Sequence, residues 1–314
     1  MIDARAKNPI IVIRRTAALG LAWWCAAAAV ASVAQEAPQS LRLRWQPGQV
    51  HTFETTTETS TDLRALGRKT DHKMKVKQVT QVAVSAGAGG RKEAKVTFKS
   101  ISGDVQDEGK TQTFDSAKPE AAPAEVRDSL VRSTGTSFVL VYGPDDNFLT
   151  VRDAGTMVRA DDGNPSLAGL AEAEQVAELY RRSLEMGLPK MKVKAGDRWT
   201  AEEMVNFPSA GMVKSEMRAR FDAVVDYNGE PHAKITFEGD LIPNPGKGAG
   251  ASAVKLAPGC KTYGQLLYHL RDGMMTFAAF RADLRLDVGG KTLPVRQQVA
   301  TKLTETQVKA GKEE

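Results

Sequence analysis

The stretches "KEAKVTFKS", from Lys92 to Ser100, and "PHAKITFEG", from Pro231 to Gly239, decide the fold of this chain. In both, small or apolar side chains alternate with lysine, threonine or glutamate. The small or apolar set is Ala94, Val96, Phe98, Ala233, Ile235 and Phe237. Because successive side chains of a strand point to opposite faces, the alternation predicts two strands, each with one buried and one solvated face.

The two stretches share the pattern Ala-Lys-(Val/Ile)-Thr-Phe, with an offset of 139 residues between Lys95 and Lys234 (234 − 95). The strands upstream also match, with Met74 aligned on Met217 at an offset of 143 (217 − 74). We assign the difference to the hairpin turns, nine residues in "SAGAGGRKE" and five in "NGEPH". The segments "PGQVHTFE" and "AGDRWTAE" open the two units. The order of these matches predicts an internal duplication with a period of roughly 140 residues, too long for a solenoid.

Two further segments predict β-hairpins. They are "TSFVLVYGPDDNFLTVRD", residues 136–153, and "FRADLRLDVGGKTLPVRQQVATKL", residues 280–303. The first carries turn residues from Gly143 to Asn147, and the second carries the pair Gly289–Gly290. Glycine pairs adopt the positive φ angles that a tight hairpin turn needs.

A long amphipathic helix is predicted from Leu167 to Met186, where "LAGLAEAEQVAELYRRSLEM" places its apolar residues on one stripe. Residues 164–166 supply a start signal, and Gly187 supplies a stop signal. A shorter helix is predicted over residues 123–132, and a long Gly/Pro-rich loop follows Leu241. The apolar stripe needs a surface, so we expect the long helix to pack on the buried face of a sheet.

The predicted fold class is mainly antiparallel β (α+β), with two related β-rich halves, curved sheets and one long amphipathic helix packed on the sheet. Residues 35–160 form the first β-rich half, residues 161–190 the linker and helix, and residues 191–314 the second half. The length is sufficient for one large domain or two of ordinary size.

Residues 1–34 have the layout of a secretory signal peptide. Arg14 and Arg15 precede an uncharged run that ends at Ala34, with small residues at the expected cleavage site. The sequence therefore predicts an exported protein, periplasmic or extracellular, that is cleaved near Ala34 and touches a membrane only through the uncleaved leader. The bulky Trp24 before Cys25 argues against a lipid anchor at that cysteine. The twin arginines leave the general and the twin-arginine export routes open.

Cleavage would leave 280 residues (314 − 34). It would remove four basic residues and one acidic residue, which changes the formal charge from +5 to +2. So small a charge over this length does not favour nucleic acid as a partner. The remaining cysteine, Cys260, has no second cysteine with which to form an internal disulfide. Stability must therefore come from a hydrophobic core.

The four histidines do not form a metal-binding motif. They are His51, His72, His232 and His269. No two have the close spacing of zinc ligands, so we expect scattered surface histidines and no metal site.

The candidate acids and nucleophiles also have structural explanations. Asp145–Asp146 and Asp272 are typical of turns, and Asp161–Asp162 of a linker before a helix. "GTSFV", which starts at Gly135, lacks the second glycine of a nucleophile elbow. "PGKGAGAS", residues 245–252, lacks the Gly-Lys-Ser/Thr order of a phosphate loop. We therefore assign no catalytic, cofactor-binding or metal-ligating residue, and expect no cofactor and no enzymatic activity.

Two polar tracts predict solvated strand surfaces. After Phe53, "TFETTTETSTD" has no large apolar residue on either face, which favours an exposed or edge strand. The lysines of "GRKTDHKMKVKQ" are explained by the wet face of a strand.

The segments "PGQVHTFETTTE", "TFDSAKP", "GTSFVLVYGPDDNFLTV" and "KAGDRWTAEE" resemble a family of uncharacterised bacterial exported proteins that is defined only as a domain of unknown function. The resemblance covers most of the mature chain. Its motifs are turns and strand starts, so it implies no activity and no site residues. A looser fold-level similarity is to lipoprotein carriers of the LolA/LppX type, in which curved antiparallel sheets enclose helices around an apolar cavity.

These observations leave two functional hypotheses of nearly equal weight. The first is a non-enzymatic exported protein that binds an apolar ligand such as a lipid, or a protein of the cell envelope, in the concavity of its sheet. The second is a structural or interaction module whose interior is filled by its own side chains. A cavity beneath the predicted helix would favour the first, and a packed contact the second. An enzyme of unknown type ranks last.

Overall fold

The computed structural model describes residues 37–68, 71–122, 127, 130, 131, 134–153, 173–207, 211–243 and 254–308. Several predictions fall outside these residues. They are the signal peptide over residues 1–34, the acidic pair Asp161–Asp162 and the "PGKGAGAS" segment. Of the short helix predicted over residues 123–132, residues 127, 130 and 131 are described, and all three are helical.

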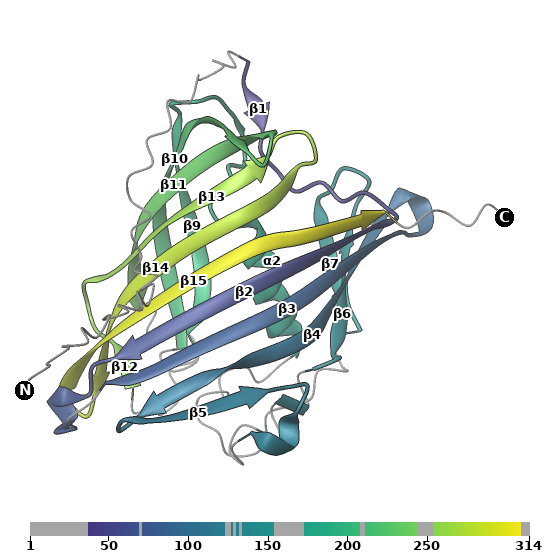
Figure 1. Ribbon diagram of the computed structural model, residues 1–314. Helices are drawn as coiled ribbons and strands as arrows, with labels where there is room; N and C mark the ends of the chain where they lie inside the picture. Colours follow the sequence, from purple (N-terminus) through teal and green to yellow (C-terminus); the bar gives the residue numbers. More distant parts are fainter. Residues whose placement is uncertain are drawn as a thin grey trace, which may run out of the picture. The chain divides into compact units, whose positions relative to one another are not determined.

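Among the described residues, one antiparallel sheet of 13 strands dominates the fold (Figure 1), which confirms the predicted mainly antiparallel β class. Strands of the first predicted half form one contiguous block, which runs across the sheet as β7-β6-β4-β3-β2, with β5 beside β4. These strands are β2 (Gln49–Thr61), β3 (His72–Ala86), β4 (Lys92–Asp107), β5 (Lys110–Asp115), β6 (Ser137–Tyr142) and β7 (Phe148–Arg152).

Strands of the second predicted half form the adjoining block, in the order β15-β14-β13-β11-β10-β9, with β12 beside β14. They are β9 (Arg198–Phe207), β10 (Gly211–Tyr227), β11 (Glu230–Pro243), β12 (Val254–Leu256), β13 (Cys260–His269), β14 (Met274–Val288) and β15 (Lys291–Val308). The two blocks meet where β2 pairs with β15. A separate two-stranded sheet consists of β1 (Gln39–Ser40) and β8 (Lys192–Val193).

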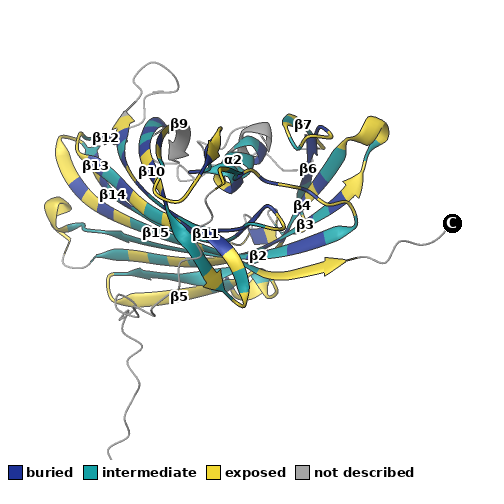
Figure 2. Ribbon diagram, turned by 90° about the horizontal axis from the view of Figure 1, so that it is seen from above, coloured by how far each residue is buried: buried dark blue, intermediate teal, exposed yellow. Residues whose placement is uncertain are grey.

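A long helix over Leu167–Met186 is not supported. The described helix, α2, has 13 residues and runs from Ala173 to Glu185, and residues 167–172 lie outside the described part. Gly187 adopts a φ of 78°, the left-handed conformation that commonly ends helices. α2 lies on the concave side of the sheet (Figure 2), with Ala177 and Leu184 in the core that it shares with the strands.

The stretches "KEAKVTFKS" and "PHAKITFEG" form the predicted strands, in β4 and β11. Phe98 and Phe237 are 8% and 7% exposed, so both rings belong to the core. Thr80 pairs with Phe98, and Ala219 pairs with Phe237. Each member of the second pair lies 139 positions after its counterpart in the first pair (219 − 80 and 237 − 98). The duplication itself stays a prediction.

The offset of 143 between Met74 and Met217 likewise stays a prediction, although the strand register gives 139 at the two phenylalanine pairs. A shift of four residues preserves the alternation of faces, so the apolar pattern alone could not distinguish the two registers. Each hairpin also contains a β-bulge, between Val79 and Thr80 in the first and between Phe221 and Ala223 in the second. A bulge inserts a residue into one strand without ending the ladder.

The predicted hairpins are confirmed as β6–β7 and β14–β15. Val288 pairs with Lys291 across the Gly289–Gly290 turn, and the two glycines have φ angles of 58° and 78°. The threonine-rich tract, in contrast, is not an edge strand. It forms most of β2, which pairs along its length with both β3 and β15. Threonine is enriched in β-strands. A threonine-rich composition therefore predicts a strand but does not distinguish an edge strand from a central one.

Candidate functional site

The strand register arranges side chains in rows across one face of the sheet, which we call the inner face. Directly paired residues of antiparallel strands share a face. The central row is Gly103, Val76, Thr57, Val299, Phe280, Gly264, Phe237, Ala219 and Trp199. The flanking rows are Ile101, Gln78, Thr55, Thr301, Ala278, Leu266, Ile235 and Phe221, and Val105, Met74, Thr59, Gln297, Ala282, Thr262, Gly239, Met217 and Ala201. None of these positions carries an ionisable side chain.

The opposite face of the same strands is charged. Lys75 and Lys77 of β3 lie 2.8 and 2.7 Å from Glu58 and Glu54 of β2. Lys73, Lys75 and Lys77 are exposed, which confirms the wet strand face predicted for the lysine-rich tract. The sheet therefore has a charged face, which is solvated, and an uncharged inner face.

The middle of the inner face is only half-buried. We call this region the central floor, and it spans β2, β3, β14 and β15. Its residues are Thr55, Thr57, Thr59, Met74, Val76, Gln78, Ala278, Phe280, Gln297, Val299 and Thr301, all of intermediate burial. Uncharged side chains that stay partly accessible beside a core are typical of ligand or partner sites.

Three buried clusters border the central floor. One lies where α2 covers β3, β4 and β6. There the ring of Tyr180 meets Phe98 and Phe138 edge-on, at centroid distances of 6.3 and 5.8 Å. This contact is packed by the protein's own side chains, so at α2 the interior is self-filled. Burial raises the pKa of Tyr180.

The second cluster lies on the inner face of β9, β10, β11 and β13. The residues after α2 take part in it, since Met186 and Leu188 pack against its buried members. The third cluster joins Leu241, Leu284 and Leu293, among others, at the far ends of the strands. The central floor is therefore bordered on several sides by core and remains half-buried between them.

Hydroxyl groups run along β2 through the central floor. Thr55 Oγ1 lies 3.0 Å from Thr301 Oγ1, so these two hydroxyls share one hydrogen bond. Thr59 Oγ1 is buried and has no hydrogen-bond partner among the described residues. Buried polar atoms are normally paired, so this hydroxyl would gain a hydrogen bond if a ligand acceptor reached it.

Three histidines are buried, contrary to the expectation of scattered surface residues. His51, His232 and His269 are 3%, 3% and 6% exposed. The rings of His232 and His269 are 4.8 Å apart, because these residues pair directly across β11 and β13. No short spacing in the sequence reveals this pair. Their proximity comes from strand register.

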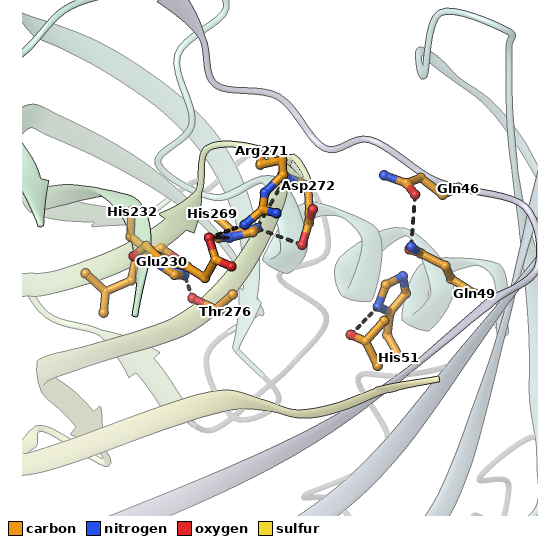
Figure 3. A network of polar contacts seen from close by, with 11 residues as sticks. Gln46, Gln49, His51, Glu230, His232, His269, Arg271, Asp272 and Thr276 are labelled. Atoms are coloured by element: carbon orange, nitrogen blue, oxygen red, sulfur yellow. Dashed lines mark hydrogen bonds and ion pairs between the residues drawn. The ribbon is translucent and has the colours of Figure 1, made fainter. Parts of the chain in front are cut away.

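The histidines belong to a polar network (Figure 3). His269 Nδ1 lies 2.8 Å from Asp272 Oδ2, and His232 Nδ1 donates to the backbone oxygen of Glu230 at 2.8 Å. Arg271 pairs with Glu230. Among the described residues, no three histidine, cysteine, aspartate or glutamate side chains are grouped so that they could hold a metal ion.

Burial lowers the pKa of His51 from 6.5 to about 4, against a smaller opposing effect of Asp272. The unfolded chain therefore binds this proton first as the pH falls. We expect His51 to reduce the free energy of unfolding by about 2.5 kcal/mol between pH 7.5 and pH 4.5. The loss should begin near pH 6.5 and be complete near pH 4. Urea unfolding of the wild type and of His51→Leu at several pH values measures it.

His51→Leu should flatten the pH dependence of the free energy of unfolding between pH 6.5 and pH 4. Equal pH dependence in His51→Leu and the wild type would show that His51 is not the titrating group.

The remaining candidates have structural roles. Asp146 lies in the predicted turn, where its Oδ1 accepts from the backbone nitrogen of Trp45 at 2.9 Å and from Lys92 Nζ at 2.7 Å. Asp272 lies in a turn, as predicted, but it also contacts a buried histidine. Cys260 is buried, its sulfur accepts from the backbone nitrogen of Arg285 at 3.1 Å, and burial raises the pKa of the thiol.

A shallow groove of about 760 Å³ lies over β9, β10, β11 and β13. Three exposed arginines line it, at positions 198, 218 and 220. Arg218 Nε lies 3.3 Å from Glu238 Oε1, and Arg220 Nε lies 2.5 Å from Asp222 Oδ1. Since nearby carboxylates offset most of the positive charge, the groove does not select strongly for an anion. The central floor is the better candidate site.

Within the described residues, α2 and the shorter helical segments all fall short of the length and apolar character of a membrane-spanning helix. No family model matches the chain, and no curated protein matches it. The resemblance to the family of uncharacterised exported proteins therefore stays an expectation.

Solved structures supply a likeness of fold. A structure that describes lipid–protein interactions in lipovitellin is similar over 86% of this chain, with a TM-score of 0.51 and 8% identity, and this chain spans 26% of its length. An outer membrane channel from Pseudomonas putida F1 gives a TM-score of 0.24, with 10% identity over 85% of this chain and 99% of the channel. MucB in complex with MucA gives 0.15, with 9% identity over 83% and 94%. The scores of the channel and of MucB are too low to establish a similar fold. The likeness to lipovitellin establishes a similar fold and nothing about function.

Proposed function

We propose that this protein binds an apolar ligand over the central floor and catalyses no reaction. The observation that carries the proposal is the uncharged inner face, which runs from β4 to β9 and is only half-buried over the central floor. The likeness to lipovitellin, a protein described by its interactions with lipid, supports a lipid as the ligand class. The predicted export would make such a protein a carrier outside the cytoplasm.

Burial of apolar area would supply the binding free energy. Covering the half-buried residues removes their apolar surface from water, at about 25 cal/mol per Å². An acyl chain adds about 0.8 kcal/mol for each methylene that it buries. Val76, Phe280 and Val299 offer the apolar contacts, and their strands are held in place by the surrounding core.

The test compares two variants at neighbouring positions of β2. Thr57 points to the inner face, and Thr56 points to the opposite face, beside Lys77. Thr57→Glu places a charge in the central floor, where an apolar ligand could not solvate it. We expect this variant to lose at least about tenfold of its bound lipid, and Thr56→Glu to retain it. Native mass spectrometry and solvent extraction of the purified protein measure the bound lipid.

Two results would contradict the proposal. One is the absence of lipid from the wild type both as purified and after incubation with lipid. The other is an equal loss in Thr56→Glu and Thr57→Glu. Far-ultraviolet circular dichroism of both variants checks that the sheet remains folded.

A self-filled structural module is the second candidate function. The packed contact of Tyr180 with Phe98 and Phe138 favours it, because no ligand is needed to fill the interior at α2. Such a module would contain no lipid after purification and would bind none on incubation with lipid. The same measurement therefore separates the two functions.

A further inference from the structure

We infer that the ligand of the central floor is an uncharged acyl ester, of the glycerol ester class, rather than a free fatty acid or a plain hydrocarbon. The inference rests on the proposed function, and it adds the chemical class of the ligand. It combines two features of the inner face: the absence of charge from its three rows, and the hydroxyl groups that run through its centre.

The lack of charge disfavours an ionised ligand. A carboxylate laid over these rows would lose its water, and no residue of the rows carries a positive charge to pair with it. The lysines of β3 sit on the opposite face, where Lys75 and Lys77 are already paired with glutamates. Burying an unpaired carboxylate is strongly unfavourable. A fatty acid could avoid this only by keeping its head group beyond the three rows.

The hydroxyl groups disfavour a plain hydrocarbon. Thr57 and Thr59 project from the middle strand of the floor, with Gln297 directly opposite Thr59 on β15. Thr59 Oγ1 is buried without a partner. The hydrogen bond between Thr55 and Thr301 uses one of their two hydroxyl protons, which leaves the other free to donate. A hydrocarbon would cover these donors and leave them unpaired, at a cost.

An ester satisfies both conditions. Its carbonyl oxygen accepts hydrogen bonds and bears no charge, so threonine hydroxyls and glutamine amides can pair with it. Its acyl chains can then extend along the central row in both directions, over Val76 on one side and Val299 and Phe280 on the other. The ester groups lie at the hydroxyls, and the chains lie on the apolar side chains.

The experiment measures uptake of three radiolabelled probes by the full, delipidated protein at neutral pH. The probes are trioleoylglycerol, oleate and octadecane, each presented in the same emulsion, with gel filtration to separate bound from free. We expect the partition ratio for trioleoylglycerol to exceed those of oleate and octadecane by at least about tenfold. Oleate or octadecane bound as well as trioleoylglycerol overturns the inference and leaves the proposed function standing. No uptake of any probe overturns both.

A variant with the three substitutions Thr55→Val, Thr57→Val and Thr59→Val identifies the hydroxyl groups as the cause. Valine keeps the branched shape and the strand propensity but cannot hydrogen bond. The preference for trioleoylglycerol over octadecane should fall to within about threefold, while octadecane uptake is retained. Thr56→Val, on the opposite face, should keep the full preference. An undiminished preference in the triple variant overturns the inference.

Discussion

Phe237→Ala is expected to reduce the free energy of unfolding by about 3–5 kcal/mol. The ring is 7% exposed and belongs to the cluster that covers β9, β10, β11 and β13. It lies over Gly264 of the neighbouring strand, where a Cβ would run into it, and beside Gly187 after α2. Its removal would therefore leave a cavity in the core. Urea or thermal unfolding, followed by circular dichroism, measures the loss.

Tyr263→Ala is the matched control, because Tyr263 precedes Gly264 on β13 and is 45% exposed on the opposite face. It should cost less than about 1 kcal/mol. Gly264→Ala tests the contact from the other side. It should be costly in the wild type and cost less in the Phe237→Ala background, where the ring is gone. Additive costs would show that the ring does not occupy the space above Gly264.

Gly103→Ala is expected to cost about 3 kcal/mol or more, at the upper end of overpacking effects. A Cβ at position 103 of β4 would run into the backbone oxygen of Lys75 on β3, and would lie 2.8 Å from Cζ of Phe114 on β5. Backbone cannot swing aside as the end of a side chain can, so β4 would have to move away from β3. Equilibrium unfolding in urea gives the change in stability.

Gly87→Ala is the control for this substitution. Gly87 has a φ of −108° and a ψ of 174°, which any residue can adopt. The nearest obstacle for its Cβ is the side chain of Glu93 at 3.1 Å, which is flexible. This variant should stay within about 0.5 kcal/mol of the wild type. Similar costs at positions 87 and 103 would contradict the close approach of β3 and β4.

The alternation of residue types was sufficient to predict which faces are buried. Ala94, Val96 and Phe98 lie in one core cluster, and Ala233, Ile235 and Phe237 lie in another, as their parity indicates. The hairpins and their turns followed from Gly, Pro, Asp and Asn, because those residues adopt the backbone angles of turns. Local chemistry therefore predicted the strands and much of their orientation.

The features that bring distant residues together could not be predicted. His232 and His269 pair because β11 and β13 adopt one register, across a connection that includes β12. The sequence predicts that the threonines of β2 are exposed, because neither face of this strand carries a large apolar residue after Phe53. Their half-buried position depends on β15, whose pairing with β2 no local pattern indicates. The central floor is a product of that pairing, so the sequence alone predicted an apolar concavity but not its residues.

The pairing of β2 with β15 sets the order in which the chain can fold. The hydrogen bond between Thr55 and Thr301 joins residues 246 positions apart. While the chain is being made, β2 has β3 on one side and an unsatisfied edge on the other, and such edges invite association with other chains. Contacts this distant in sequence form slowly. The nascent chain would thus benefit from a chaperone, and a premature stop before Lys291 would leave two strand edges permanently open.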